Sequence, residues 1–281
     1  MALFISGMKD DILGFSRHIV LSIFIMEKPF SANTKQAQSL IKLSEKTGKF
    51  IFPFHNRRWD SDFLTLKQII AHGSLGKIVD YESRFDRYTP KILRAAWKYN
   101  QTEGGGTLFD LGTHLIDQAI CLFGRPEGVF GMLFNQREGS LTDDSFDLRL
   151  IYPDLTVTLR AGVFVKEPGP RFQVHGTVGS FVKYGLDSQE AQLRNGKKPG
   201  SKGFGIEPAT QRGILNTVLS GKEFRGLVKA LPGNYMDFFN NVYEVIVNGA
   251  EMAVKPEDAL LNVRIIEAAH KSDKEKKIIY L

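Results

Sequence analysis

The sequence predicts an α/β unit followed by an α+β unit. Two observations carry this prediction: a strand–helix–strand succession over residues 19–54, and a series of candidate strands from residue 79 to residue 184 with helical segments around it. With 281 residues, the chain is long enough for about two domains. Apolar residues make up 42% and charged residues 24%, which is typical of a folded globular protein rather than a disordered one.

The first predicted unit is a single βαβ unit. The apolar run Ile19–Met26 fits a buried strand, and Phe50–Phe54 fits a second one. Between them, Ser31 is predicted to cap a helix whose apolar residues 37, 40 and 41 share one face, and Gly48 is predicted to end it. A unit of this kind implies parallel strands joined by a right-handed crossover.

The second unit begins with an amphipathic helix over Ser61–His72 and a strand over residues 79–86. In that strand, residues 79, 81, 83 and 85 are predicted to face the core, and the intervening charged residues face water, as in an antiparallel sheet. We expect one open sheet in which this charged face lies exposed or at a subunit contact: Asp80, Glu82, Arg84 and Asp86. The other predicted elements are strands at Val129–Asn135, Phe146–Tyr152, Thr156–Val165, Arg171–Gly176 and Ser180–Tyr184, a loop at Arg194–Gly205, and helices at Asp237–Val247 and Glu257–His270.

Charge, hydropathy and cysteine content argue against several classes of protein. The 37 Lys and Arg residues exceed the 31 Asp and Glu residues by only six and form no stripe interleaved with aromatic residues, so we expect no nucleic-acid partner. No apolar run approaches the roughly 18–20 residues of a membrane span, and the N-terminus does not resemble a secretory signal, so we expect no membrane partner. The single cysteine, Cys121, excludes an intrachain disulfide and fits a reducing compartment, so we expect a cytoplasmic protein.

Three titratable side chains share one face of the helix predicted within Gly104–Phe123. Asp110, His114 and Asp117 stand at i, i+4 and i+7, which places them within about 60° of one another on a regular helix. Three interpretations remain open: a solvated face with an Asp–His pair, a metal site, or proton transfer by His114 with a carboxylate that tunes its pKa. Glu-x-x-His and His-x-x-x-His motifs are absent from this predicted helix, so we expect no metal.

Two more polar clusters follow the two strands of the βαβ unit, where ligands of parallel sheets bind. Glu27-Lys28-Pro29 follows the first strand, and Lys28 has the chemistry to donate to a hydroxyl or to polarise a carbonyl. His55–Asp60 follows the second strand, and its Arg58 and Trp59 form a planar pair suited to stacking or to anion binding. Each cluster alone also fits a polar surface loop, and the three clusters become informative only together.

Together these motifs resemble those of a known family. EKPF at 27–30, HNRRWD at 55–60 and GGGTLFDLGTHLIDQA at 104–119 are similar to motifs of the Gfo/Idh/MocA family of NAD(P)-dependent oxidoreductases, in its scyllo-inositol-dehydrogenase-like branch. The resemblance covers residues 26–281. It implies a remnant of a Rossmann-type, dinucleotide-binding parallel sheet over residues 1–57. Residues 58–281 would be a substrate and oligomerisation domain with a large, open, mostly antiparallel sheet flanked by helices.

The resemblance also implies roles for individual residues. Lys28, Asp110 and His114 would be the catalytic and substrate-binding groups, with His114 as the general acid/base. The residues beside the cofactor would be Glu27, Lys28, Pro29, Arg58 and Trp59. The implied cofactor is NAD(P), with NADP favoured, the substrate a polyol or sugar, and the assembly a homo-oligomer formed through the C-terminal sheet.

The sequence departs from the family pattern near its N-terminus. Residues 1–25 match no pattern of the family, and no G-x-G-x-x-G segment occurs in the chain. The alternative to a dehydrogenase is therefore a cofactor-free remnant that binds a polyol or only self-associates. With few neighbouring strands, the apolar side chains of Phe50–Phe54 are expected to stay uncovered and to promote association.

Overall fold

The computed structural model describes residues 23–92 and 104–281, and its elements follow the predicted order. The first half of the chain contains β1 (Ile23–Met26), α1 (Thr34–Thr47), β2 (Phe50–Pro53), the 3-10 turn η1 (Asn56–Trp59), α2 (Ser61–Ala71), β3 (Ile78–Asp86), the π-helical turn η3 (Leu108–Gly112), α3 (Thr113–Phe123) and β4 (Gly128–Phe134). The second half contains β5 (Ser145–Ile151), β6 (Thr156–Gly162), β7 (Phe172–Gly176), β8 (Gly179–Lys183), α4 (Gln189–Arg194), η4 (Ala209–Gln211), β9 (Gly213–Leu219), β10 (Lys222–Val228), α5 (Met236–Asn248), α6 (Pro256–Glu275) and β11 (Ile279–Tyr280). Residues 19–22 of the first predicted strand lie outside the described residues.

The predicted βαβ unit is present. Strands β1 and β2 pair in parallel, with Ile23 opposite Phe50, and α1 connects them. Helix α1 is capped by Asn33, whose side chain accepts a hydrogen bond from the Gln36 amide, so the prediction of Ser31 as the cap was wrong by two residues. The predicted stop is confirmed, because Gly48 ends the helix in the left-handed region with φ of 63°.

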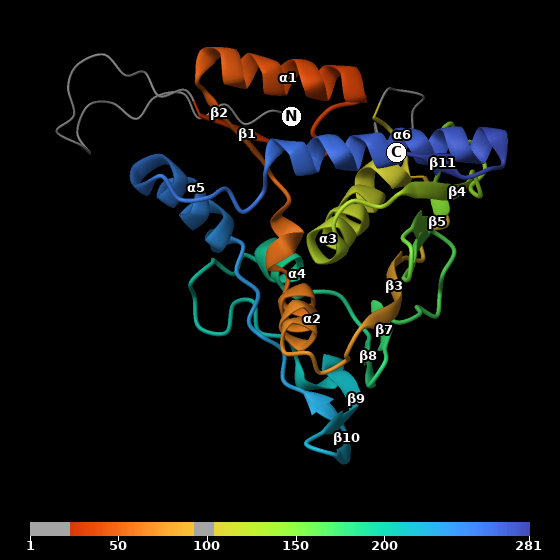
Figure 1. Cartoon of the computed structure of the whole chain (residues 1–281), viewed down its shortest axis with the longest axis vertical. Coiled ribbons are helices and arrows are strands. Elements are labelled where there is room, and N and C mark those ends of the chain that lie inside the picture. The colour runs from red at the N-terminus through yellow and green to blue at the C-terminus, as the bar shows by residue number, and fades with distance from the viewer. Residues whose placement is uncertain (1–22, 93–103) are drawn as a thin grey trace.

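Both faces of this small sheet are covered by helices, which contradicts the expected exposure of Phe50–Phe54. Helices α1 and α6 pack with Ile51 in one apolar cluster, and α5 packs with Phe52 in another. Ile51 is only 6% exposed and Phe52 only 2%. The expectation was wrong because α5 and α6, from the end of the chain, return to cover strands near its beginning (Figure 1).

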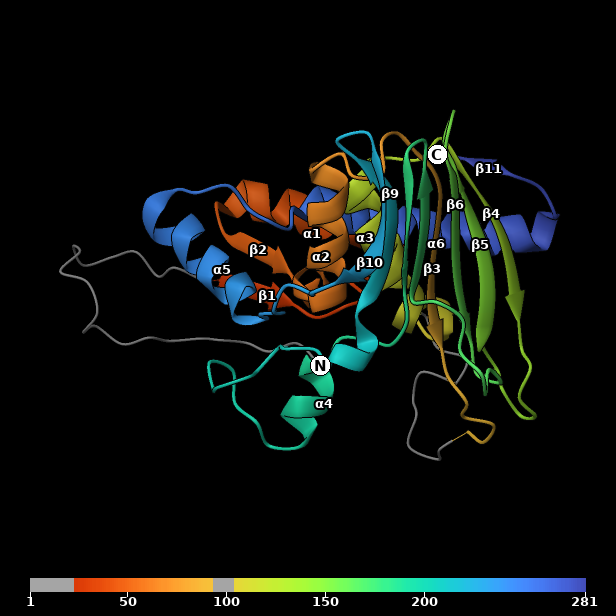
Figure 2. The ribbon, with the colours of Figure 1, turned by 90° about the horizontal axis from the view of Figure 1, so that it is seen from below.

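The described strands of the second unit form one large sheet in the order β10-β9-β8-β7-β3-β6-β5-β4-β11. The expectation of an open, mostly antiparallel sheet flanked by helices is confirmed, and β3 and β6 are the one parallel pair among these neighbours. Strand β3 lies between β6 and β7, with Tyr81 opposite Val157 on one side and Val174 on the other. Figure 2 shows α2 and α3 on one side of this sheet. Residues of α2, α3 and α6 share a single apolar core with the sheet.

The alternation predicted in β3 is present with one exception. Tyr81 and Phe85 are buried in the core, and the charged residues between them lie on the other face, where Glu82 pairs with Arg84 and lies 3.6 Å from Arg160. Val79 is 41% exposed, because a register shift between residues 78 and 80 turns it out of the core face. The polar face therefore runs across neighbouring strands and is linked by ion pairs.

The β9–β10 hairpin, α4 and β11 were not predicted from the sequence. Ser220 and Gly221 join the hairpin with positive φ angles of 51° and 77°. Within residues 23–92 and 104–281, no helix is long and apolar enough to cross a membrane.

Candidate functional site

Lys28 and Asp110 form the contact that joins two of the predicted clusters. Lys28 lies two residues beyond the end of β1, and Asp110 lies in the π-helical turn η3. Lys28 Nζ donates to Asp110 Oδ1 at 2.6 Å and to the Asp110 carbonyl oxygen at 2.8 Å. Both side chains are about one-fifth exposed, at 22% and 21%, so the pair remains accessible to a ligand.

His114 lies one turn beyond Asp110, at the start of α3. It is 4% exposed, and Nδ1 is buried without a hydrogen-bond partner among the described residues. Its ring meets the Phe85 ring edge-to-face, with centroids 6.4 Å apart and planes at 76°. Burial, reinforced by the charge of Arg57, holds the pKa of His114 well below its usual value. His114 is therefore a neutral imidazole near pH 7, able to accept a proton.

The solvated helix face with an Asp–His pair, which was one of the open interpretations, is wrong. His114 and Asp117 are both buried, and each neighbouring carboxylate is paired with a cation from another element. Asp110 accepts from Lys28, and Asp117 accepts from Arg58. In addition, the stretch before α3 is a π-helical turn, so the regular angular spacing that grouped the three side chains does not apply there.

Arg58 and Asp117 form a buried, two-pronged ion pair behind His114. Arg58 Nε donates to Asp117 Oδ2 at 2.9 Å, and Nη2 donates to Oδ1 at 2.7 Å. Burial raises the pKa of Asp117, but the charges of Arg58 and His55 and the hydrogen bonds from Arg58 together outweigh burial and leave that pKa below its usual value. Arg58 also donates to the Ala253 carbonyl at 2.6 Å and to Asp258 at 3.0 Å, so it links η1, α3 and α6.

His55 is a second buried histidine beside this ion pair. It lies two residues beyond β2 and directly precedes η1, and it is 2% exposed. Its Nδ1 lies 3.8 Å from Asp117 Oδ1, beyond hydrogen-bond distance. Burial lowers the pKa of His55, and the carboxylate of Asp117 opposes this shift only in part.

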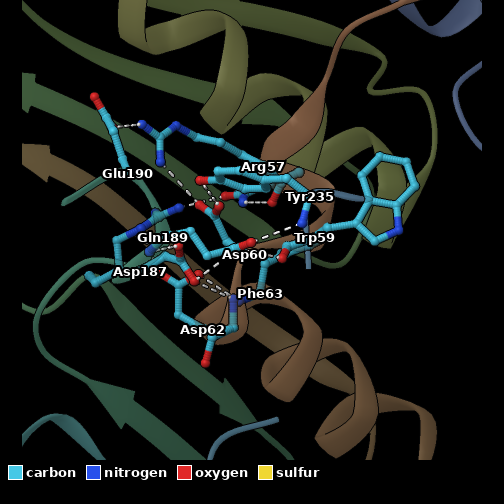
Figure 3. Close-up of polar contacts among 12 residues, drawn as sticks. Arg57, Trp59, Asp60, Asp62, Phe63, Asp187, Gln189, Glu190 and Tyr235 are labelled. Atoms are coloured by element: carbon cyan, nitrogen blue, oxygen red, sulfur yellow. Dashed lines mark hydrogen bonds and ion pairs between the residues drawn. The ribbon is translucent and has the colours of Figure 1, made fainter. Parts of the chain in front are cut away.

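Trp59 and Arg58, predicted as a planar pair, diverge in the structure. Trp59 packs edge-to-face on Phe238, with ring centroids 5.8 Å apart, and belongs to the apolar cluster beneath α5. In Figure 3 its indole points away from the polar contacts. Of the other predicted cofactor residues, Glu27 is exposed, and Pro29 follows Lys28 through a cis peptide bond and lies against Gly104.

A set of carboxylates next to Arg57 was not predicted from the sequence: Asp60 and Asp187 are buried, and Glu190 is 42% exposed. Arg57 donates to Glu190 Oε2 at 2.7 Å and pairs with Asp60 at 3.2 Å, and Tyr235 donates its hydroxyl to Asp60 at 2.8 Å (Figure 3). Asp187 caps the start of α2 through the Ser61 amide, at 2.8 Å. Burial raises the pKa values of Asp60 and Asp187. Residues 187, 190 and 235 carry no local motif, so no signal in the sequence marked them.

Asp143 fixes the start of the turn that carries Asp110. Its Oδ2 accepts from the Leu108 amide at 2.7 Å, and its backbone carbonyl accepts from the Thr107 amide at 2.8 Å. Burial raises the pKa of Asp143 to about 6. Gly106 has φ of 99°, and a Cβ there would lie 2.1 Å from Asp143 Oδ1, so only glycine fits this approach.

A cavity of about 610 Å³ lies next to Gly104 and Gly105, lined in part by Phe109, Asp143 and His270. None of the predicted site residues lines it. The candidate site thus lies outside this cavity. It consists of the Lys28–Asp110 contact and the buried His114 one turn further along the chain, and Asp117, the partner of Arg58, lies on the same helix as His114.

Comparison with known proteins shows the family to which most of the chain belongs. Residues 67–281 match the family model described as the C-terminal alpha/beta domain of an oxidoreductase family, Gfo/Idh/MocA. The scyllo-inositol 2-dehydrogenase (NADP(+)) IolW of Bacillus subtilis is 39% identical over 257 residues, which cover 92% of this chain and 72% of that protein. The oxidoreductase YdgJ of Escherichia coli is 35% identical over 257 residues, covering 92% of this chain and 73% of that one.

Solved structures of oxidoreductases have the same fold as this chain. The oxidoreductase yvaA from Bacillus subtilis superimposes with a TM-score of 0.88 at 39% identity, covering 92% of this chain and 73% of that one. An oxidoreductase from Bacteroides fragilis gives a TM-score of 0.84 at 43% identity, covering 92% and 74%. The extent of these matches, together with the family model over residues 67–281, shows that the chain belongs to the Gfo/Idh/MocA family of oxidoreductases.

Proposed function

We propose that this protein is a dehydrogenase that moves a hydride between NAD(P) and a CH–OH group of a polyol or sugar. The observation that carries the proposal is the contact of Lys28 with Asp110, placed one turn from the buried His114. The scyllo-inositol 2-dehydrogenase relative supports an inositol as substrate and NADP as the favoured cofactor.

In this proposal, Lys28, Asp110 and His114 bind the substrate and transfer the proton. The Lys28 ammonium has three N–H donors, of which Asp110 takes two, so one remains for the substrate oxygen. Asp110 holds Lys28 in place and accepts from a substrate hydroxyl. His114 accepts the hydroxyl proton during oxidation and returns it during reduction. The nicotinamide cofactor supplies the hydride acceptor.

The residues after β1 have the position and chemistry to contact the nicotinamide end of such a cofactor. Lys28 and Pro29 lie beyond the carboxyl end of β1, the edge at which parallel sheets bind ligands, and we assign Glu27, Lys28 and Pro29 to this end. We place Arg58 and Trp59 behind the site, where they support it. The sequence contains no G-x-G-x-x-G segment, so no residue is assigned to the pyrophosphate.

That same missing motif favours a second candidate, a domain that binds a polyol without a cofactor. Titration with NADPH, followed by the fluorescence of the reduced nicotinamide, separates the two candidates. The dehydrogenase predicts saturable binding and NADP-dependent oxidation of scyllo-inositol. Absence of NADPH binding, with scyllo-inositol still detected by calorimetry, would replace the dehydrogenase with the binding domain.

We also propose a division at residue 57, with a dinucleotide-binding part before it and a substrate and oligomerisation domain over 58–281. The family match from residue 67 onward supports this division. The sheet face opposite the helices, where Met132 is 36% and Phe134 is 42% exposed beside charged side chains, is the proposed contact between copies. Light scattering of Met132→Glu should report a smaller assembly than that of the unmodified protein.

A further inference from the structure

Arg57 is held by a polar network that is buried except for the partly exposed Glu190, and none of the proposed catalytic residues belongs to it (Figure 3). Its Nη2 donates to Glu190 at 2.7 Å, and its Nη1 pairs with Asp60 at 3.2 Å. Asp60 is fixed in turn by the Tyr235 hydroxyl at 2.8 Å. The Arg57 side chain is 12% exposed, so the guanidinium has little freedom to leave this position.

Arg57 also contacts the surroundings of His114 in two ways. Its guanidinium lies over the Phe85 ring, 5.1 Å from the centroid, and Phe85 is the ring that meets His114 edge-to-face. Its backbone carbonyl accepts from Gln118 Nε2 at 2.9 Å, and Gln118 lies one turn beyond His114 on α3. Arg57 therefore contacts both Phe85, whose ring lies against the His114 imidazole, and helix α3, which carries His114.

Cations act on His114 more strongly than carboxylates do, although each of these cations is itself held in an ion pair. The two carboxylate neighbours of His114 on the helix are already paired, Asp110 with Lys28 and Asp117 with Arg58. Arg171, which also lies over Phe85 at 4.2 Å, is paired with Asp62 at 3.3 Å. The groups that disfavour a charged His114 are, in decreasing order after burial itself, Arg57, Lys28, His55 and Arg171.

We propose that Arg57 is a positioning residue for the reaction: it fixes the Phe85 wall against which the His114 ring lies and keeps a positive charge beside that ring. The inference rests on the proposed dehydrogenase function, because it deepens the role given to His114 there. Its consequence is that Arg57 adds to burial in disfavouring the imidazolium, so the imidazole stays in the proton-accepting form.

The test is a histidine-selective NMR titration of the full chain, with the His114 signal assigned by its loss in His114→Asn. The chain has six histidines, so the spectrum is simple. Arg57→Gln should move the His114 titration to higher pH, and Arg57→Lys should move it upward by less. Arg194→Gln is the matched control, because Arg194 pairs with the same Glu190 at the surface and contacts neither Phe85 nor α3. The control should leave the His114 titration in place.

Turnover adds a second readout. We expect Arg57→Gln to lower kcat by about 10- to 100-fold and to shift the acidic limb of the pH profile upward, as expected when a catalytic group is displaced. A folded Arg57→Gln protein whose His114 titrates as in the unmodified protein would overturn the inference, even if its melting temperature fell. If Arg57→Gln does not fold, Arg57→Lys decides: an unmoved His114 signal together with an unchanged kcat overturns the inference. If the protein shows no dehydrogenase activity, the proposed function is wrong. The NMR titration of His114 still tests the effect of Arg57 on His114 in that case.

Discussion

Lys28 Nζ lies 2.6 Å from the carboxylate of Asp110, a residue 82 positions further along the chain. This contact ties the end of the small parallel sheet to the π-helical turn that precedes α3. It brings the EKPF and D-x-x-x-H motifs to one place, and His114 follows within one turn. The proposed chemistry depends on this junction between the two parts of the chain.

Removal of the Lys28 ammonium should therefore reduce turnover. Lys28→Met removes one fixed donor to the substrate oxygen, which costs about 10²–10³ in kcat in comparable sites. Lys35→Met, on the exposed side of α1, is the control and should retain the kcat of the unmodified protein. Steady-state oxidation of scyllo-inositol measures both variants. Equal kcat values for the two variants would remove Lys28 from the reaction.

The Arg58–Asp117 pair should contribute to stability rather than to chemistry. Arg58→Met leaves the Asp117 carboxylate, which is 2% exposed, without its cation, and such a loss costs about 3–5 kcal/mol in the free energy of unfolding. Lys77→Met breaks the exposed pair of Lys77 with Asp154 and should leave the urea midpoint unchanged. Equilibrium urea unfolding measures both variants, and similar midpoints would contradict the supporting role of Arg58.

Local patterns predicted most of the fold and the position of the helix that carries the proposed catalytic His114. Local hydrophobic periodicity along the chain predicts the strand–helix–strand unit, the alternation in β3 and the final helices. The β9–β10 hairpin was missed because β10 lies at a sheet edge, where nearly all of its residues are at least partly exposed and no alternation marks it. Its Ser220-Gly221 turn was the signal that could have revealed it.

The partners of the predicted site residues could not be read from the sequence. Arg58 meets Asp117 across 59 positions, and Arg57 meets Glu190 across 133. Only the tertiary fold creates these pairs. The apparent Asp–His grouping on the helix failed for the same reason, since each carboxylate found a stronger, cationic partner elsewhere.

Buried His114 should make the protein less stable in acid. Because burial lowers the pKa of His114 in the folded state, only the unfolded state takes up this proton as the pH falls below about 6.5, and the free energy of unfolding drops. The His114→Gln substitution should reduce the slope of the free energy of unfolding against pH by up to about 1.4 kcal/mol per pH unit. Asp143, whose folded pKa of about 6 acts in the opposite direction, is common to both proteins and cancels. Urea unfolding from pH 8 to pH 5 measures the difference, and parallel curves would show that His114 is not a buried neutral base.

Gly106 should tolerate no side chain. Gly106→Ala adds a Cβ 2.1 Å from Asp143 Oδ1 at a φ of 99°, so it should cost more than the roughly 1–3 kcal/mol of backbone strain alone. Gly196→Ala, with φ of 77° and nothing within 4 Å of the added Cβ, isolates the strain. The difference between the two urea-derived free energies of unfolding measures the clash with Asp143. No difference would mean that Asp143 does not hold the turn as described.

Proton transfer by His114 is the central claim, and paired measurements on His114→Asn test it most directly. NADP-dependent oxidation of scyllo-inositol gives kcat, and NADPH fluorescence titration of the same preparation gives the cofactor affinity. We expect kcat to fall by about 10²–10⁴ at neutral pH, because general acid–base catalysis contributes a factor of this size, while the Kd for NADPH stays unchanged. A His114→Asn protein that turns over as fast as the unmodified one would contradict the claim.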